Sequence, residues 1–293
     1  MSGKIGILNS DAAGACRDGQ GGERPYVLGH ASDEIDRLII QAQILRPITE
    51  RLLRSAGIAA GMRVLDLGCG AGDVSILAAE LVGPTGSVIG LDRNPDVLAV
   101  AKQRAREAGF DRVNFVEAAV EAFSSVELFD CVIGRYVLVY QADPEGFLRA
   151  ARRLVRPGGI IALHELSFKA GRRSHPAVSL WDLAMALVEA AFRDAVARPE
   201  VGEQMLKVFL NADLPPPNLF CEIPLSGGEG SPFYDWIPGT LRSLQPQLSK
   251  MGILPNQILS IDTLKERLRR DVVAARSQIS GPTQFCGWVR LPS

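Results

Sequence analysis

Short apolar runs and segments with helical spacing alternate along most of this chain. The apolar runs, typical of buried strands, occupy residues 64–67, 88–91, 113–117, 130–134 and 160–166. Apolar residues at helical spacing between them predict helices at 74–81, 95–108 and 144–154. Strands that alternate with helices in this way form a mostly parallel sheet with helices on both faces. The pattern therefore predicts a doubly wound α/β fold.

Two further segments precede this array. Residues 1–24 are rich in glycine, alanine, serine and aspartate without periodicity, which predicts a flexible tail. Residues 25–60 are expected to form a helical cap of two helices, and residues 61–293 the main domain. The first helix begins at Ser32 or Asp33, which suit an N-cap, and the second begins at Pro47, because proline suits a first turn.

A glycine-rich turn follows the first strand. Residues 64–72 read VLDLGCGAG, so a buried strand carrying Asp66 runs into glycines at every second position. Glycine permits backbone conformations that other residues avoid, and a helix that starts after such a turn offers free N–H groups to a ligand. Dinucleotide-binding proteins use a similar turn with the spacing GxGxxG, but here Asp73 stands in the place of the third glycine.

The turn resembles motif I of the class I S-adenosylmethionine-dependent methyltransferases. Other features of that family follow in order, including Asp92 after the second strand and RLVRPGG before the fifth. The exit of the fourth strand, GRYVLVYQADP, resembles the branch that acts on small molecules. The resemblance covers residues 26–168. It implies a Rossmann-like fold and S-adenosylmethionine as the cofactor.

The resemblance also implies which residues hold the cofactor. Asp66 and the glycines hold its amino acid end, while Asp92 accepts from both ribose hydroxyls. Ala119 stands where many relatives have an aspartate that binds the adenine amine, so Glu121, backbone or water takes that contact. The predicted cofactor-binding residues are Tyr26, Gln41, Asp66, Gly68, Cys69, Gly70, Asp92, Arg93, Ala119, Val120, Gly134 and Arg135.

The C-terminal part of the chain extends the sheet and covers it. A helix at 179–197, apolar on most sides, is expected to pack on the sheet and on the cap. Strands predicted at 218–225 and 284–291 form an antiparallel pair at one edge in this kind of fold. Between them, residues 226–282 contain a glycine-rich hinge, the aromatic trio Phe233, Tyr234 and Trp236, and two helical patterns. We expect this insertion to be a lid over the acceptor.

Composition narrows the function classes. The net charge of −1 and the pI near 6.3 argue against a dedicated nucleic-acid surface. The five cysteines form no CxxC pair and no two of the three histidines share metal-ligand spacing, so we expect no protein-bound metal. No leader-like segment appears, and no apolar run approaches the ~18 residues that a membrane span needs. A cytoplasmic protein without membrane contact is therefore expected.

Three side chains are candidates for catalysis. Methyl transfer from a sulfonium needs alignment and exclusion of water, and a base only for some acceptors. His164 and Glu165 end the fifth strand, and Tyr136 follows the fourth, at the edge where parallel sheets bind ligands. Because strand residues alternate in direction, His164 and Glu165 face opposite ways, and Glu165 is favoured for the cleft. A local hydrogen-bond network is the open alternative for each of these two.

The sequence thus predicts a methyltransferase that transfers a methyl group to O, N or C of a small, largely apolar metabolite. The expected partner is that small-molecule acceptor, and a homodimer is left open. A non-methylating protein that binds an S-adenosyl ligand, such as a cyclase or a regulator, is the alternative on the same fold. An NAD-linked reductase is a more distant one.

Overall fold

The computed structural model describes residues 32–169 and 174–293. Its centre is a seven-stranded sheet with the order β3-β2-β1-β4-β5-β10-β7. The strands are β1 (Arg63–Leu67), β2 (Ser87–Asp92), β3 (Val113–Glu117), β4 (Phe129–Arg135), β5 (Val155–Ser167), β7 (Asn218–Glu222) and β10 (Thr283–Arg290). Strands β1 to β5 run parallel, whereas β10 pairs antiparallel with both β5 and β7. The predicted mostly parallel sheet with an antiparallel last strand is confirmed.

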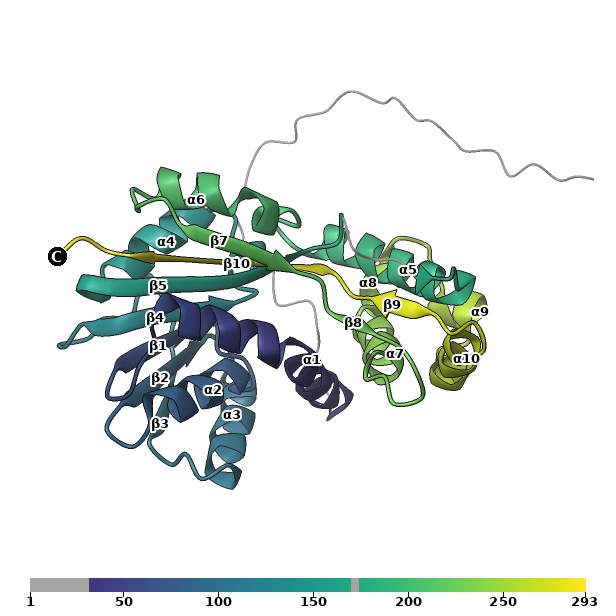
Figure 1. Ribbon diagram of the computed structural model, residues 1–293, viewed down its shortest axis with the longest axis horizontal. Helices are drawn as coiled ribbons and strands as arrows, with labels where there is room; N and C mark the ends of the chain where they lie inside the picture. Colours follow the sequence, from purple (N-terminus) through teal and green to yellow (C-terminus); the bar gives the residue numbers. More distant parts are fainter. Residues whose placement is uncertain (1–31, 170–173) are drawn as a thin grey trace, which may run out of the picture.

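Helices cover both faces of the sheet (Figure 1). One face packs against α1 (Ser32–Ala56), α2 (Asp73–Val82) and α3 (Pro95–Glu107), and the other against α4 (Pro144–Arg152) and α6 (Met205–Asn211). The helix boundaries follow local chemistry. Asn94 accepts from the backbone N–H groups of Asp96 (2.8 Å) and Val97 (3.3 Å), so it caps α3, which Gly109 follows at φ 78°.

The N-terminal segment forms one helix where the sequence predicted two. Pro47 lies inside α1, although proline removes one hydrogen bond from a helix interior. Tertiary packing compensates for that loss, since α1 contacts α7 of the insertion as well as α2, β5 and β10 of the main domain. Helix α1 therefore bridges the two parts of the molecule. The predicted tail at residues 1–24 lies outside the described residues.

The insertion builds a helical lobe beside the sheet (Figure 1). It contains four helices, α7 (Phe233–Ser243), α8 (Gln245–Lys250), α9 (Pro255–Leu259) and α10 (Ile261–Ala274), where the sequence predicted two helical patterns. Helix α5 (Ser179–Ala195) packs on these four helices, which corrects the prediction that it lies on the sheet and the cap. A small sheet of β6 (Ser174–His175), β9 (Gln278–Ser280) and β8 (Leu225–Ser226) joins the lobe to the main domain.

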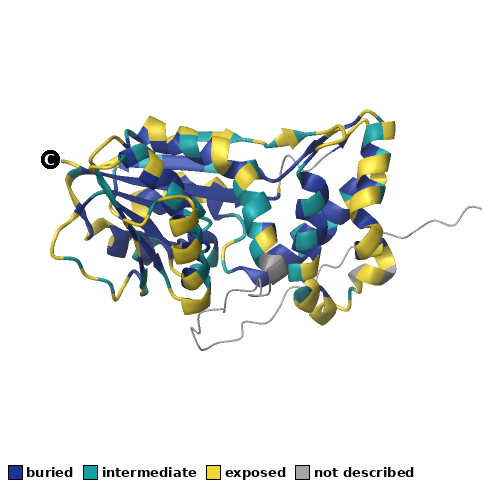
Figure 2. Cartoon of the chain, turned by 90° about the horizontal axis from the view of Figure 1, so that it is seen from below, coloured by how far each residue is buried: buried dark blue, intermediate teal, exposed yellow. Residues whose placement is uncertain are grey.

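The buried side chains of the lobe are continuous with the hydrophobic core on one face of the sheet (Figure 2). Trp181 of α5 is fully buried there, with its ring centroid 5.5 Å from that of Phe233 in α7. Aromatic side chains at such spacing contribute strongly to a core. Among residues 32–169 and 174–293, no helix combines the length and apolar character needed to cross a bilayer.

Candidate active site

A cavity of about 720 Å³ lies at the carboxyl ends of the parallel strands, between the sheet and the helical lobe. Its wall includes the loops after β1, β2 and β4, together with side chains of α1, α5 and α7. Open parallel sheets bind their ligands at this edge. The predicted residues that line it are Gln41, Asp66, Gly68, Cys69, Gly70, Asp92, Arg93, Ala119, Val120, Arg135 and Tyr136. Tyr26 lies outside the described residues.

The glycine loop has the backbone that its sequence demands. Gly68, Gly70 and Gly72 adopt φ of 60°, 51° and 83°, a region that favours glycine. A Cβ on Gly68 would lie 2.8 Å from Cγ1 of Val137, whereas one on Gly70 would meet nothing within 4 Å. Gly68 is therefore required for packing of the loop, and Gly70 leaves space in the cavity free for a ligand.

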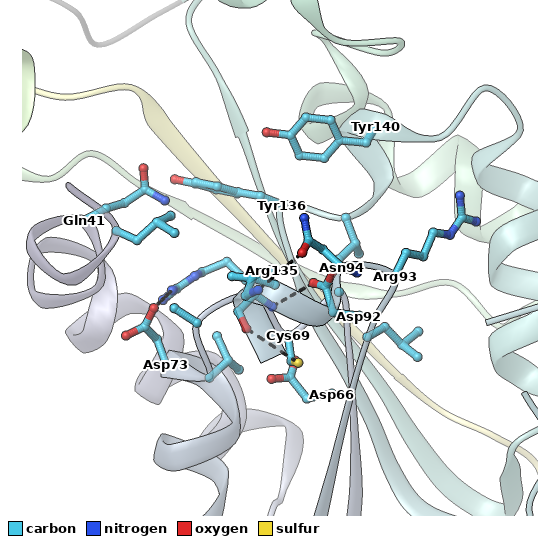
Figure 3. Close-up of a pocket in the computed structure, with 18 of the residues that line it drawn as sticks. Gln41, Asp66, Cys69, Asp73, Asp92, Arg93, Asn94, Arg135, Tyr136 and Tyr140 are labelled. Atoms are coloured by element: carbon cyan, nitrogen blue, oxygen red, sulfur yellow. Dashed lines mark hydrogen bonds and ion pairs between the residues drawn. The ribbon is translucent and has the colours of Figure 1, made fainter. Parts of the chain in front are cut away.

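Asp92 at the end of β2 holds the loop in place. Its Oδ2 accepts from the N–H of Gly70 at 2.9 Å and its Oδ1 from the N–H of Asn94 at 3.0 Å. A carboxylate has about four lone-pair sites, so each oxygen can accept one more hydrogen bond from a ligand. Figure 3 shows this carboxylate at the cavity, beside the glycine loop. Asp92 is thus placed to bind a diol.

Asp66 is a second carboxylate in the cavity wall, and it is almost fully buried. Ser75 donates a hydrogen bond to its Oδ2 at 2.6 Å. Burial raises the pKa of Asp66 to about 7, because a charged carboxylate is poorly solvated there, and the Ser75 hydroxyl opposes that shift. The side chain is therefore poised to ionise when a cation binds nearby.

An ion-pair cluster that the sequence did not predict supports the loop. Asp73, the residue that breaks the dinucleotide-binding spacing, lies 2.6 Å from Arg104 of α3 and 3.7 Å from Arg135. Arg104 also donates to the backbone carbonyl of Ala71 at 2.7 Å. In the sequence, only the aspartate in place of a third glycine at position 73 indicated this cluster, because Arg104 and Arg135 lie far from it along the chain.

Gln41 forms the roof of the cavity together with Trp236. Its Oε1 accepts from Nη1 of Arg37 at 2.8 Å and from the indole Nε1 of Trp236 at 3.3 Å. The contact with Trp236 joins α1 to α7. Because both lone pairs of the Gln41 oxygen are used, only its amide N–H₂ group can bind a ligand. Of the predicted aromatic trio, Trp236 lines the cavity, whereas Phe233 and Tyr234 belong to the core of the lobe.

The loop after β3 forms the predicted adenine end of the site. Ala118, Ala119 and Val120 line the cavity after β3. Glu121, proposed for the adenine amine, is exposed and pairs with Arg93 at 3.3 Å. It is absent from the cavity wall formed by the described residues, so backbone or water has to meet that amine.

His164 and Glu165 face opposite sides of β5, as strand alternation requires, but neither lines the cavity. Glu165 is fully buried, and its Oε1 accepts from the N–H groups of Val137 (2.9 Å) and Leu138 (2.8 Å). His164, also fully buried, contacts Thr49 and Gln284. Neither therefore occupies the predicted catalytic position in the cleft: both ring nitrogens of His164 and Oε1 of Glu165 have partners in the interior, whereas Oε2 of Glu165 has none among the described residues. Tyr136 is the predicted catalytic residue that reaches the cavity.

Gly134, which was predicted to bind the cofactor, does not line the cavity either. It lies buried in β4, below the cavity wall, where a Cβ would be 2.8 Å from Cγ2 of Val137. The residue permits close packing of the loop that carries Tyr136, and it is absent from the cavity wall that the described residues form.

Replacing Glu165 with glutamine is expected to flatten the pH dependence of stability. Burial raises the pKa of Glu165 to about 8, against 4.5 for an ordinary glutamate, and three backbone N–H groups oppose that shift. Its Oε2 has no hydrogen-bond partner among the described residues. A carboxyl whose folded pKa is raised stabilises the fold fully below pH 4.5, and this contribution is lost as pH rises through about 8.

The slope of that loss is about 1.4 kcal/mol per pH unit. Thermal unfolding of the wild type and Glu165→Gln at pH 5 and pH 8 measures it, because the other titrating groups cancel in the difference. Relative to the wild type, the variant should gain stability as the pH rises. An unchanged difference between the two proteins at both pH values would contradict the assignment.

The far part of the cavity is apolar. Its wall there is formed by side chains from α4, β5 with the residues just after it, α5 and the α7–α8 junction, namely Phe147, Leu166, Phe168, Val188, Phe192 and Leu244. Phe168 and Phe192 approach with ring centroids 5.1 Å apart. Tyr140, Gln141 and Thr240 add a few polar groups. One cavity therefore combines a polar half at the glycine loop with an apolar half under the lobe.

Part of this chain is similar in sequence to known proteins. Residues 58–196 match the family described as a methyltransferase domain. The aklanonic acid methyltransferase DauC of Streptomyces sp. strain C5 is 33% identical over 48% of this chain and 64% of its own. The ubiquinone/menaquinone biosynthesis C-methyltransferase UbiE of Pasteurella multocida is 38% identical over 38% of this chain and 42% of its own. The chain thus spans less than two thirds of either relative.

A solved structure supports the fold. A protein of Bacillus halodurans C-125, described as a methyltransferase, has a TM-score of 0.54 and 21% identity, and the match covers 84% of this chain and 99% of that one. At this identity the likeness concerns the fold alone. The matched segment carries the glycine loop, Asp92 and the strand exit with Tyr136, and residues 58–196 are thus similar to the class I S-adenosylmethionine-dependent methyltransferases.

Proposed function

We propose that this protein transfers a methyl group from S-adenosylmethionine to a small, largely apolar acceptor. The observation that carries the proposal is the division of the cavity into a polar half beside Asp66, Asp92 and the glycine loop and an apolar half under the helical lobe. The polar half suits the cofactor that the family uses. The apolar half, lined by phenylalanine, leucine and valine side chains, suits a hydrophobic acceptor.

The residues in the polar half fit the cofactor. The cofactor, when bound, supplies a methyl group on a positively charged sulfur. Asp92 would accept from the ribose hydroxyls, and ionised Asp66 would favour the positive charge of the amino acid end. The open space in front of Gly70 leaves room for close approach of the ligand to the loop backbone. These contacts support cofactor binding on chemical grounds.

The chain contributes alignment and exclusion of water to the reaction. Placing the attacking atom in line with the methyl group can lower a barrier by ~7–11 kcal/mol through positioning alone. The roof formed by Gln41 and Trp236 would keep water from the reacting atoms. In this proposal the insertion acts as the lid, and neither His164 nor Glu165 serves as a base.

Incubation of the purified protein with methyl-labelled S-adenosylmethionine and a cell extract tests the proposal. We expect label in the small-molecule fraction together with release of S-adenosylhomocysteine. Label in RNA or protein instead would contradict the substrate class. Tight binding of the cofactor without product from any acceptor would favour the non-methylating alternative.

Cofactor affinity is expected to rise with pH through about 7. Asp66 in the free protein is neutral below its raised pKa of about 7 and ionised above it. Because the ionised form favours the ammonium group of the amino acid end, the Kd for S-adenosylhomocysteine should fall up to about tenfold per pH unit below that pKa and then level off. Calorimetry between about pH 5.5 and 7.5 measures this, and Asp66→Asn should remove the dependence. A wild-type Kd that is constant across this range would contradict the role of Asp66.

The homodimer and the cytoplasmic location remain predictions. Light scattering after size exclusion distinguishes a monomer of 31.6 kDa from a dimer of twice that mass.

A further inference from the structure

Tyr136, the residue after β4, belongs to a hydrogen-bond network that reaches β5, β10 and α1. Its hydroxyl donates to Oε1 of Gln284 in β10 at 2.6 Å, and Nε2 of His164 in β5 lies 3.0 Å from the same oxygen. The amide nitrogen of Gln284 donates to the carbonyl of Pro282 at 2.8 Å. Nδ1 of His164 lies 3.0 Å from Oγ1 of Thr49 in α1.

The protons in this network can be placed by elimination. Because Nε2 of Gln284 donates to Pro282, Oε1 points toward Tyr136 and His164 and can only accept. Nε2 of His164 must therefore carry a hydrogen. Burial and the nearby Arg135 lower the pKa of His164 to about 3, so the ring is neutral and its Nδ1 can only accept. The Thr49 hydroxyl lies 3.0 Å from Nδ1, and its single proton also reaches the carbonyl of Leu45 at 3.1 Å.

This arrangement fixes the direction in which the Tyr136 hydroxyl donates its hydrogen bond. Its single proton is directed to Gln284, and both lone pairs of that amide oxygen are used. The phenol oxygen is therefore left with lone pairs and no proton for a ligand. Burial also raises the pKa of Tyr136, which keeps the phenol neutral and argues against a role as a base.

The backbone holds Tyr136 in the cavity wall. The residue has φ of 58°, an unusual conformation for a bulky side chain, and its N–H donates to the carbonyl of His164 at 2.8 Å. Glu165 binds the next two N–H groups along the chain. Figure 3 shows the Tyr136 ring crossing the cavity above Arg135, with its hydroxyl end directed toward Gln41. Strained residues held in this way often mark functional sites.

We propose that Tyr136 recognises a hydroxyl or N–H group on the apolar acceptor, and that Gln284 and His164 are positioning residues that fix its oxygen as a hydrogen-bond acceptor. The inference rests on the proposed function, since the acceptor is the substrate of that site. It names the acceptor class as hydrophobic molecules with a donor, such as phenols, enols or aromatic amines. Ketones and ethers at the same point would meet an oxygen that cannot donate. The cofactor's carboxylate is likewise excluded as the partner of Tyr136.

The test compares two probes, a phenol and its methyl ether, in which a methyl group replaces the donor hydrogen. Calorimetry of protein saturated with S-adenosylhomocysteine gives the Kd values of 2-naphthol and 2-methoxynaphthalene. We expect the wild type to prefer 2-naphthol by about threefold to tenfold, which corresponds to one net hydrogen bond. Tyr136→Phe should lose the preference. Gln284→Met should also lose it, because the Tyr136 proton is then free to turn toward the ether.

Two further variants exclude a merely structural effect. Gln284→Glu keeps an oxygen that accepts from Tyr136, so this variant should retain the preference for 2-naphthol that Gln284→Met loses. Tyr234→Phe makes the same chemical change in the lobe, where Tyr234 donates to the carbonyl of Gly228 at 2.8 Å, and it should keep the preference.

A preference that survives in Tyr136→Phe or Gln284→Met would overturn the inference, as would undetectable binding of 2-naphthol to the loaded protein. Failure of S-adenosylhomocysteine itself to bind would instead count against the proposed function. Tyr136→Phe should bind S-adenosylhomocysteine with the wild-type Kd, and a tenfold loss there would assign Tyr136 to the cofactor and overturn the inference.

Discussion

Replacing Asp92 with alanine is expected to weaken S-adenosylhomocysteine binding by about a hundredfold or more. The carboxylate would accept two ribose hydroxyls, and each hydrogen bond to a charged group contributes about 1.5–3 kcal/mol. The substitution also releases the N–H groups of Gly70 and Asn94, which Asp92 now holds at 2.9 and 3.0 Å. Calorimetric titration of both proteins measures the ratio of the Kd values.

Two controls sharpen this prediction. Asp92→Asn keeps one carbonyl oxygen as an acceptor, so its Kd should lie between those of the wild type and Asp92→Ala. Asp262→Ala removes a carboxylate from α10 whose side chain is 90% exposed, and it should bind like the wild type. An Asp92→Ala protein that is folded and binds within threefold of the wild type would refute the assigned role.

Replacing Gly70 with alanine is expected to weaken cofactor binding by about tenfold to a hundredfold, or ~1.4–2.8 kcal/mol. A Cβ there would meet nothing within 4 Å in the free protein, so it would project into space that the ligand needs. The φ of 51° adds a strain of about 1–2 kcal/mol to the free energy of folding. Loss of affinity and loss of stability must therefore be measured separately.

Gly109→Ala is the matched control for Gly70→Ala. Gly109 has φ of 78°, and a Cβ on it would also meet nothing within 4 Å, but it lies at the end of α3 and not in the cavity wall. Denaturant unfolding should show a comparable loss of stability in both variants. Calorimetry should show weak binding only for Gly70→Ala, and equal affinities of the two variants would contradict the placement of the ligand.

The sheet could be predicted from the sequence because its strands are short apolar runs bounded by turns. The run at 113–117 coincides with β3, and the neighbouring strands differ from their predictions mainly at their ends. The helix break expected at Pro47 did not occur, because packing of α1 on both the helical lobe and the main domain outweighs the local preference of proline. The four helices of the insertion were harder to predict, because short helices depend on contacts within the lobe.

The polar half of the cavity was predictable because its residues come in short motifs at strand ends. Asn94 was missed there, although the sequence DRNP carries the signal of a helix cap. The other half depends on long-range contacts. The partners of His164 lie 115 and 120 residues away, in α1 and β10, and local alternation cannot show that they fill its hydrogen bonds. For the same reason, Glu165 could not be assigned to the loop after β4 from the sequence.

The central claim is that the loop between β1 and α2 binds an S-adenosyl ligand and not a nicotinamide dinucleotide. Calorimetric titration of the full chain with S-adenosylhomocysteine, and separately with NADH, tests it most directly. We predict saturable one-site binding of S-adenosylhomocysteine that is lost in Asp92→Ala, and no comparable heat with NADH. Binding of NADH with equal or greater affinity, or no binding of S-adenosylhomocysteine, would contradict the claim.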